Sequence, residues 1–596
     1  MSERTGSEFD RRRFLLTSGA LGVGGLLAGC SGGESNGSGG TTGGSGGGGN
    51  DGGGTTASGA SDAATTTQGT GSSNANQSSG ASSANRGGTF VGATAEDAPT
   101  LDPRMNELAW ANSFLQYVFS TLYIVPPDGS EPVSHVAKEQ PQQQDDATYT
   151  IPIKEGITFH DGSELTAEDV AYSFNWILDP DNKSPNRANL QFIDSVEATG
   201  EYETRFNLKN PFALFELTLA GMNAGIVPKA IAEEQGTESF GQQPVGSGPF
   251  EFVERESAAY FLLERNPEYF LETPNLDRIR MRIIPKPQVQ FIELVGGNVD
   301  QATVPKNLLG RAENAENIQL GKFPQFDYNG IVFNTMREPF DNPKVREAMQ
   351  YVVDYDALLK ASKGELGTRS YGFMPLEVNK AWEFPWQEWK EQYFPAKDLD
   401  RARQLLSEAG YDGGIDKTLK MSTLASGKFA NMMTIFQNQL NEIGIQAEVQ
   451  QLTIGRWLSE LDSGKFDATI YGWSGGQDPD GFYYYLFRDL RNDEEGMSED
   501  LVGNASAGYL YQSNPESEQL QQLDSNIREA RRLQNRDERR QLYVDAAETV
   551  QSLYPNIPVF SEQTVEGWNA NLKNYENTAF ATQPLCNEWS NAHFEQ

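Results

Sequence analysis

From about residue 87 onward, hydrophobic positions at helical spacing alternate with short hydrophobic runs. Thr166 and Asp169 have the spacing of a capping box. The apolar residues after them recur on one face of a predicted helix: Val170, Phe174, Ile177 and Leu178. Runs at 149–153 and 468–473 instead predict strands. Helices and strands follow one another without a fixed-period repeat, so the pattern predicts an α/β or α+β body of more than one domain.

Two further helices have recognisable ends. Pro343 stands at a first helical position, where its missing N–H is tolerated, and an apolar face continues from there to Val353. The segment 401–409 is predicted as a helix that ends at Gly410, because glycine favours the left-handed conformation that commonly closes a helix. An N-terminal segment of different composition precedes this periodic structure.

Residues 31–85 have a composition that cannot form a hydrophobic core. They consist of Gly, Ser, Thr, Asn, Ala and Gln with three charged residues, Glu34, Asp51 and Asp62. As a flexible coil this segment spans about 40 Å root-mean-square, from about 5–6 Å times the square root of its length. We therefore predict a disordered tether over 30–86, long enough for a folded body to move over a membrane partner.

The first thirty residues have the order of an export signal. Arg11 and Arg12 precede an apolar, Gly/Ala-rich stretch that ends at Cys30. The stretch has about fifteen residues, too few to cross a bilayer, which needs about 20. The arginine pair resembles a twin-arginine signal, and 27–30 (LAGC) resembles a lipobox, in which the cysteine is lipidated after removal of 1–29. The alternative is a cysteine that ends a hydrophobic run by chance.

The charge balance excludes some partners. The chain carries 83 acidic and 47 basic side chains, for a net charge of -36. A field of this sign repels nucleic acid and anionic lipid surfaces, so neither is expected as a partner. It suits a protein that stays hydrated in molar salt, where the screening length is about 3 Å. A halophilic protein is therefore favoured over an ordinary acidic secreted one. Two cysteines and three histidines are too few and scattered for a disulfide framework or a histidine-based metal site, so no metal or cofactor is expected.

Short motifs occur in a characteristic order along the body: 87–89 (GGT), 99–103 (PTLDP), 154–163 (KEGITFHDGS), 165–170 (LTAEDV), 244–250 (PVGSGPF), 264–270 (ERNPEYF), 340–348 (FDNPKVREA), 402–411 (ARQLLSEAGY) and 472–479 (GWSGGQDP). In this order they resemble the solute-binding protein family 5 of ABC importers, which includes oligopeptide-, dipeptide- and nickel-binding proteins. The resemblance covers about 87–596, and the order of the motifs makes it specific.

The resemblance implies an α/β, two-lobed fold like that of periplasmic binding proteins (type II, cluster C). A hinge of two crossing strands would join the lobes, with the ligand enclosed between them. By this resemblance lobe I covers 87–325, with an extra subdomain at about 116–235. Lobe II covers 326–524, and the chain returns to lobe I over 525–596.

The segment after the predicted strand at 468–473 is the first candidate for a ligand wall. Trp473 precedes a Gly-rich loop with Gly476, Gln477 and Asp478, and aromatic residues follow. A strand end that opens into such a loop commonly binds ligand, and a packed aromatic cluster is the alternative. In peptide-binding relatives an aspartate three residues after this tryptophan pairs with the ligand's α-ammonium. Gly476 occupies that position here, so either Asp478 reaches the same place or the ligand carries no ammonium.

Two other segments are candidates for ligand contact. By the resemblance, Met105, Trp110 and Asn112 lie where relatives touch their ligand. Arg369 and Tyr371 could meet an anionic end of the ligand, because an arginine fork suits a carboxylate. For these residues a solvent-exposed position is the alternative.

The pair His160-Asp161 invites a catalytic interpretation that local geometry does not favour. Adjacent side chains in a strand or turn point apart, and Asp161-Gly162 is a common turn dipeptide. A structural role is therefore expected. The chain shows no credible Ser/His/Asp or HExxH constellation, so no catalytic residue is assigned.

The resemblance implies a binding protein and not an enzyme. Such a protein captures a small solute between its lobes and delivers it to ABC permease subunits. A peptide or peptide-like solute is favoured, and a sugar or oligosaccharide is the alternative. With its predicted lipid anchor the protein would lie on the extracellular face of the cell membrane. A secreted, lipid-anchored hydrolase is the competing hypothesis, because abundant carboxylates could conceal a catalytic pair.

The lipobox makes a direct prediction. Cys30→Ala should release the protein into the medium or leave an uncleaved precursor, because no thiol remains to carry the lipid. Cell fractionation and the mass of the mature N-terminus measure this. Replacing Arg11 and Arg12 by Lys should instead block export, because a receptor reads the twin-arginine signal. A Cys30→Ala protein that stays membrane-bound in lipidated form contradicts the lipobox.

Overall fold

The computed structural model describes residues 86–425, 427–489, 508–514, 516–575, 577–578 and 583–595. The predicted signal peptide over 1–29, with Arg11 and Arg12, lies outside the described residues. Cys30 and the predicted tether up to residue 85 lie outside them as well. Among the described residues, no helix combines the length and the apolar character that crossing a bilayer requires.

A four-stranded sheet begins the described chain. Its order is β1-β10-β9-β8, with β1 parallel to β10 and the other pairs antiparallel. Phe114, Phe240 and Phe261 are buried in the core that this sheet shares with two helices. The elements are β1 (Thr89–Thr94), β8 (Phe250–Glu256), β9 (Tyr260–Arg265), β10 (Arg278–Ile283), α2 (Ala109–Leu115) and α6 (Lys229–Phe240).

A second sheet, of order β4-β5-β7-β6, is inserted between β1 and β8 and has its own core. Its helix α3 confirms the predicted capping box, since the Asp169 carboxylate accepts the backbone N–H of Thr166 at 3.0 Å. The apolar face of α3 packs Phe174 against Phe206 of the sheet. The elements are β4 (Gln142–Asp145), β5 (Thr148–Pro152), α3 (Ala167–Leu178), α4 (Arg187–Leu190), β6 (Ile193–Gly200), β7 (Glu203–Leu208) and α5 (Phe215–Leu219). Before them in the chain, β2 (Tyr123–Ile124) and β3 (Val133–Ser134) form a separate antiparallel pair.

The largest sheet has the order β11-β18-β13-β17-β15-β16, and β12 and β14 also pair with β18. Strands β15 and β17 are parallel, as are β15 and β16, whereas β13 is antiparallel to both β17 and β18. The strands are β11 (Gln301–Thr303), β12 (Ile318–Pro324), β13 (Asp327–Phe333), β14 (Gly367–Arg369), β15 (Leu419–Leu424), β16 (Ala447–Leu452), β17 (Ala468–Ser474) and β18 (Asn556–Asn569).

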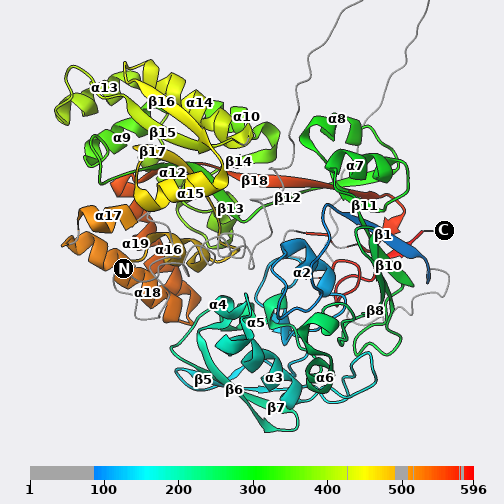
Figure 1. The fold of residues 1–596 in the computed structure, drawn as a ribbon. Coiled ribbons are helices and arrows are strands. Elements are labelled where there is room, and N and C mark those ends of the chain that lie inside the picture. The colour runs from blue at the N-terminus through cyan, green and yellow to red at the C-terminus, as the bar shows by residue number, and fades with distance from the viewer. Residues whose placement is uncertain are drawn as a thin grey trace, which may run out of the picture.

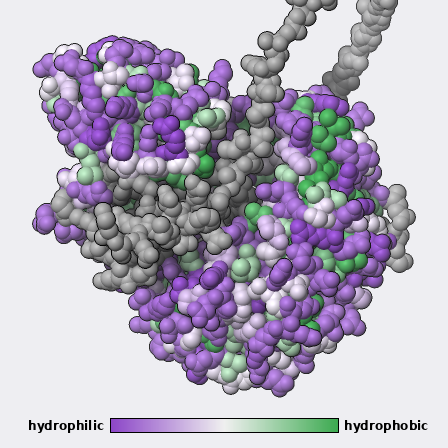
Figure 2. Space-filling model, in the orientation of Figure 1, coloured by the Kyte–Doolittle hydropathy of each residue, from purple (hydrophilic) through white to green (hydrophobic). Residues whose placement is uncertain are grey.

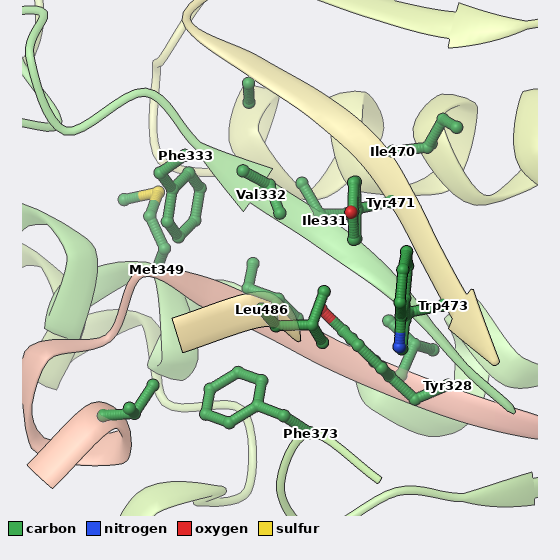
Figure 3. Packing of buried hydrophobic residues seen from close by; sticks show 14 of the residues in the cluster. Tyr328, Ile331, Val332, Phe333, Met349, Phe373, Ile470, Tyr471, Trp473 and Leu486 are labelled. Carbon is green, nitrogen blue, oxygen red and sulfur yellow. The ribbon is translucent and has the colours of Figure 1, made fainter. Parts of the chain in front are cut away.

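Helices cover this sheet and share one core with it, which runs from Phe326 to Phe560. Figure 3 shows part of it, where Ile331 and Tyr328 of β13 lie beside Tyr471 and Trp473 of β17. The helices are α9 (Pro343–Val352), α10 (Tyr355–Ser362), α11 (Leu376–Ala381), α12 (Trp386–Tyr393), α13 (Leu399–Glu408), α14 (Gly427–Asn441), α15 (Ile454–Ser463), α16 (Asp480–Phe487), α17 (Gly508–Ser513), α18 (Glu518–Arg532) and α19 (Arg536–Leu553). Helices α9 and α13 and strands β5 and β17 confirm the predicted elements.

The predicted lobe boundary at 524/525 lies within α18, and α19 follows it. Their residues Ile527, Tyr543 and Val550 are fully buried in the same core as β13 and β17. This core therefore continues past residue 524 and ends within β18. We call the part of the chain built on it the second body. The first body comprises the two smaller sheets with α7 (Pro287–Val295), α8 (Leu309–Ala312) and the core beneath those helices.

The surface facing the viewer in Figure 2 is predominantly hydrophilic, as the acidic composition leads one to expect. Hydrophobic residues gather on this face over α7, where Val289 and Ile292 are exposed. The C-terminal segment closes the first body with the short pair β19 (Leu572–Lys573) and β20 (His593–Phe594).

One long strand, β18, joins the two bodies. Its first part pairs with β13 of the second body, and from Gln563 onward it pairs with β12, whose last residue is Pro324. The chain of β12 continues through residues 325–326 into β13, so two antiparallel strands cross between the bodies together. In Figure 1 β18 runs from beneath α9 and α10 to the region of α7 and β11. Two paired strands that bend together are a recognised form of hinge.

Buried charges lie where the crossing strands change partners. Asp327 Oδ1 accepts the backbone N–H of Glu562 at 2.8 Å, and its Oδ2 accepts Asn329 Nδ2 at 2.7 Å. Glu562 forms ion pairs with Lys363 and Lys428 from the second body. The backbone N–H of Gln325 donates to the Glu562 carbonyl at 2.8 Å. Because both carboxylates are nearly buried, these bonds fix the position at which β18 leaves one body for the other.

Burial, reinforced by the charge of Glu562, raises the pKa of Asp327 to about 7. Burial also acts to raise the pKa of Glu562, but the ion pairs with Lys428 and Lys363 outweigh it and lower that pKa below 4.5. The folded chain thus keeps a proton on Asp327 that the unfolded chain loses near pH 3.8. The contribution of Asp327 to the free energy of unfolding therefore falls as pH rises from about 4 to about 7.

Asp327→Asn should remove this pH dependence, because an amide cannot ionise. Relative to wild type, the variant should gain stability as pH rises from about 4 to about 7, by at most about 1.4 kcal/mol per pH unit. Urea unfolding at a series of pH values measures it. Glu562→Gln is the comparison variant: because the charge of Glu562 reinforces the raised pKa of Asp327, its removal should give a smaller gain of the same sign between pH 4 and 7, and a change of the opposite sign below that range. Parallel pH profiles of Asp327→Asn and wild type between pH 4 and 7 contradict the assignment.

Candidate functional site

The loop between β17 and α16 is held by Trp473. Its Nε1 donates to the carbonyl oxygen of Gly481 at 2.7 Å, and its ring stacks on Tyr485 with centroids 5.8 Å apart. The loop backbone comes close to itself, since a Cβ on Gly481 would lie 1.7 Å from the carbonyl oxygen of Gly475. Gly476 has a φ of +77°, which glycine adopts without strain. The sequence therefore shapes a compact loop, and the 6% exposed Trp473 supports it from beneath.

Two aspartates in this loop are neutralised by arginines of α18 and α19. Asp478 Oδ1 accepts Arg539 Nη2 at 2.8 Å in a pair that is largely shielded from solvent. Asp480, 1% exposed, is bound by Arg531 and accepts the hydroxyl of Tyr543 at 3.1 Å. Burial raises the pKa of Asp480, and the arginine charges act against it. A buried carboxylate needs such a partner, because an unpaired buried charge is costly.

The facing wall comes from the first body, from the region of α4 up to β6 and from the segment between β7 and α5. Phe192 and Phe212 lie together with ring centroids 4.2 Å apart. The backbone N–H of Ala213 donates to the carbonyl of Arg531 at 2.9 Å. The Arg531 guanidinium lies over the rings of Tyr484 at 3.8 Å and Phe212 at 4.6 Å. Side chains of the two bodies thus meet around one arginine.

A cavity of about 200 Å³ lies between these walls. One wall belongs to the loop and α16 of the second body together with Arg531 of α18, and the other to α4, α5 and the segment around β7 of the first body. The lining residues are Ala188, Asn189, Gln191, Phe192, Lys209, Asn210, Pro211, Phe212, Leu214, Leu217, Thr218, Gly475, Gly476, Gln477, Asp478, Asp480, Gly481, Tyr485 and Arg531. A mixed apolar and amide lining between two bodies is the usual setting of a small-ligand site.

The structure brings three of the candidate residues to this cavity: Gly476, Gln477 and Asp478. Trp473 does not line it and acts through its contacts with Gly481 and Tyr485, which do. The sequence predicted that the binding wall includes Trp473; in this structure Trp473 lies in the core beneath the wall, and its contact with a ligand stays a prediction.

Met105, Trp110 and Asn112 do not line this cavity. Asn112 Oδ1 accepts Asn106 Nδ2 at 2.6 Å, and Trp110 lies against Phe261 with centroids 6.0 Å apart. These contacts place the segment on the core of the first sheet. Its relation to a ligand stays a prediction.

Arg369 and Tyr371 do not line the cavity either, and both have partners within the second body. Arg369 Nη1 donates to the carbonyl oxygens of Pro558 and Val559 on β18, and its guanidinium lies 3.8 Å from the ring centre of Tyr355. Burial lowers its pKa. Tyr371 stacks on Trp386, with centroids 5.8 Å apart. In this arrangement the arginine fork serves the backbone of β18.

His160 has a structural role, as expected. Its Nε2 lies 3.0 Å from the Gly248 carbonyl, and its Nδ1 accepts the backbone N–H of Gly246 at 3.3 Å, so the ring supports that turn. Burial lowers its pKa to about 4, which keeps the ring neutral near pH 7. Among the described residues, no group of three or more His, Cys, Asp or Glu side chains could hold a metal ion.

Comparison with known proteins assigns the chain to a family. The family model described as bacterial extracellular solute-binding proteins, family 5, matches residues 131–494. The chain is 28% identical to the oligopeptide-binding protein AppA of Bacillus subtilis over 449 residues, which cover 71% of this chain and 78% of AppA. It is 30% identical to the glutathione-binding protein GsiB of Escherichia coli K12 over 380 residues, which cover 62% of this chain and 71% of GsiB.

A solved structure shares the fold. HbpA2 from Haemophilus parasuis superposes with a TM-score of 0.73 at 22% identity, over 85% of this chain and all of HbpA2. The α/β, two-lobed architecture expected from the motifs is therefore confirmed, with the first and second bodies as its lobes and β12–β13 and β18 crossing between them. The chain belongs to family 5 of the extracellular solute-binding proteins.

Proposed function

We propose that this chain is the substrate-binding protein of an ABC importer, which captures a peptide or peptide-like solute between its lobes and delivers it to permease subunits. The observation that carries the proposal is the cavity lined by both bodies. Two crossing strands connect those bodies, so closure about them could bury a small ligand and exclude water from its polar contacts.

The lining favours a peptide-like solute over a sugar. Its apolar surface includes Phe192, Phe212 and Tyr485, which suits the side chains of a peptide. Gln477 and Asn210 offer amide groups that match peptide N–H and C=O groups. The names of the relatives support this choice, since AppA is an oligopeptide-binding protein and GsiB a glutathione-binding protein.

We propose binding without chemistry. Hydrolysis by paired carboxylates needs one group that can give a proton and another that can attack or activate water. In the cavity, Asp478 is paired with Arg539, and Asp480 with Arg531. Both carboxylates are thus engaged in structural ion pairs, which argues against the hydrolase alternative at this site.

We further propose that the protein is a lipoprotein of a halophile, exported through Arg11 and Arg12 and anchored at Cys30 on the outer face of the cell membrane. Lobe I would cover 87–325, with its extra subdomain at about 116–235. Because α18 and α19 share the core of the second body, we place the return to lobe I within β18 and not at 525.

The function is tested with the purified full chain and a library of short peptides. Bound peptides, identified by mass spectrometry after gel filtration, should raise the melting temperature and leave with unchanged mass. A peptide at 100 times its Kd should add about 2.7 kcal/mol to the free energy of unfolding. Cleaved peptides would support the hydrolase instead, and enrichment of oligosaccharides with no peptide would support a sugar ligand.

Trp473→Phe tests the support of the loop. The variant keeps a stacking ring but loses the Nε1 hydrogen bond to Gly481, so stability should fall by about 1 kcal/mol. Peptide binding should weaken about fivefold or more, since roughly the same free energy is lost from the position of the loop. Calorimetry with an identified peptide measures the affinity.

The chain offers a matched control in Trp457, which is also buried and donates from Nε1 to Thr469 Oγ1 at 3.0 Å. Trp457→Phe loses an equivalent bond away from the cavity. It should reduce stability to a similar extent and leave the affinity unchanged. Equal affinities of the Trp473→Phe and Trp457→Phe variants would remove Trp473 from the account of binding.

A further inference from the structure

The two carboxylates of the cavity wall are neutralised by arginines before any ligand enters. Asp478 Oδ1 accepts two donors, Arg539 Nη2 at 2.8 Å and the backbone N–H of Asp480 at 2.9 Å. The arginine side chain is 7% exposed and the aspartate side chain 11%, so water does little to screen this pair. A ligand cation at Asp478 would have to share a carboxylate whose charge Arg539 already neutralises.

Both carboxylate oxygens of Asp480 already have hydrogen-bond donors. One of its carboxylate oxygens accepts Arg531, and the other accepts the hydroxyl of Tyr543 at 3.1 Å. Arg531 is in turn held between the rings of Tyr484 and Phe212. An incoming ammonium could reach Asp480 only by breaking a buried ion pair whose arginine also contacts Phe212 of the first body.

The remaining polar groups of the wall do not suit a ligand cation. Gln477 Oε1 is buried and has no hydrogen-bond partner among the described residues, so it can accept an N–H or O–H from a ligand. Lys209 Nζ donates to the Gln191 carbonyl at 2.7 Å and adds a positive charge to the wall. The described wall thus presents an open acceptor and a cation, and its carboxylates are already paired.

The apolar part of the wall supplies the rest of the binding surface. Phe192 and Phe212 lie on the first body, and Tyr485, backed by Trp473, lies on the second. Closure of the two bodies would enclose an apolar side chain between these rings. Burial of apolar surface needs no charge on the ligand.

We propose that this cavity binds its solute through amide N–H groups and an apolar side chain, and that a free α-ammonium contributes nothing to binding. This inference rests on the proposed peptide function and narrows it: peptides with blocked amino ends are ligands equal to free ones. Gln477 is the residue that determines this specificity, because its side chain supplies the open acceptor where a carboxylate would select for an amine.

The test uses one tripeptide library in two forms, with free and with N-acetylated amino ends. The full chain should retain both forms, and the Kd values of matched pairs should agree within about threefold. A loss of tenfold or more on acetylation overturns the inference while leaving the proposed function intact. If neither form is retained, the proposed peptide function fails and the inference fails with it.

Gln477→Glu provides the converse experiment. The substitution keeps the shape and an acceptor oxygen but adds an unpaired carboxylate, so the variant should prefer free amino ends over acetylated ones by about tenfold. Gln144→Glu adds the same charge at an exposed position on β4, and should show no preference. A Gln477→Glu protein that binds both forms equally would overturn the assignment of this specificity to Gln477.

Discussion

A single strand shared by two bodies is the constraint on which the rest of this structure depends. Strand β18 exchanges β13 for β12 at Glu562, and the backbone and carboxylate of that residue are bonded to Gln325, Asp327 and two lysines. The crossing point is therefore defined by directional, buried bonds and not by a loose linker. Because the crossing is defined, the loop after β17 and the segment after β7, more than two hundred residues apart in sequence, form opposite walls of one cavity.

Buried carboxylates are paired with cations at the cavity, as Glu562 is at the crossing strands. In a chain with 83 acidic side chains, carboxylates could have dominated the wall, yet the two that line it are bound by arginines from α18 and α19. These pairs fix the loop, and Arg531 additionally meets Phe212 of the first body. The two carboxylates of the wall thus have a structural role, in ion pairs that hold the loop. The outer face that Figure 2 shows is largely hydrophilic.

Local sequence patterns correctly predicted helix ends and one strand. The capping box at Thr166, the proline that opens α9, the glycine after α13 and the strand that ends in Trp473 all formed where periodicity placed them. Three residues of the loop after Trp473 reached the cavity for the same reason. Contacts between residues far apart in the sequence could not be predicted from local patterns. Arg369 binds carbonyls of β18 nearly two hundred residues away, and Phe192, Phe212 and Arg531 carry no local motif that marks them as a wall. The sequence of an amphipathic helix such as α18 does not show which core the helix joins, and its place in the core of β13 and β17 came only from the structure.

The two bodies are expected to close about the crossing strands when solute binds. Spin labels at Glu197→Cys on β6 and Glu448→Cys on β16, both exposed and on different bodies, report this as a distance distribution. With a saturating bound peptide the distribution should narrow and shift to shorter distance, because closure brings the bodies together. A doubly labelled protein that binds peptide with an unchanged distribution would contradict a hinge at β18.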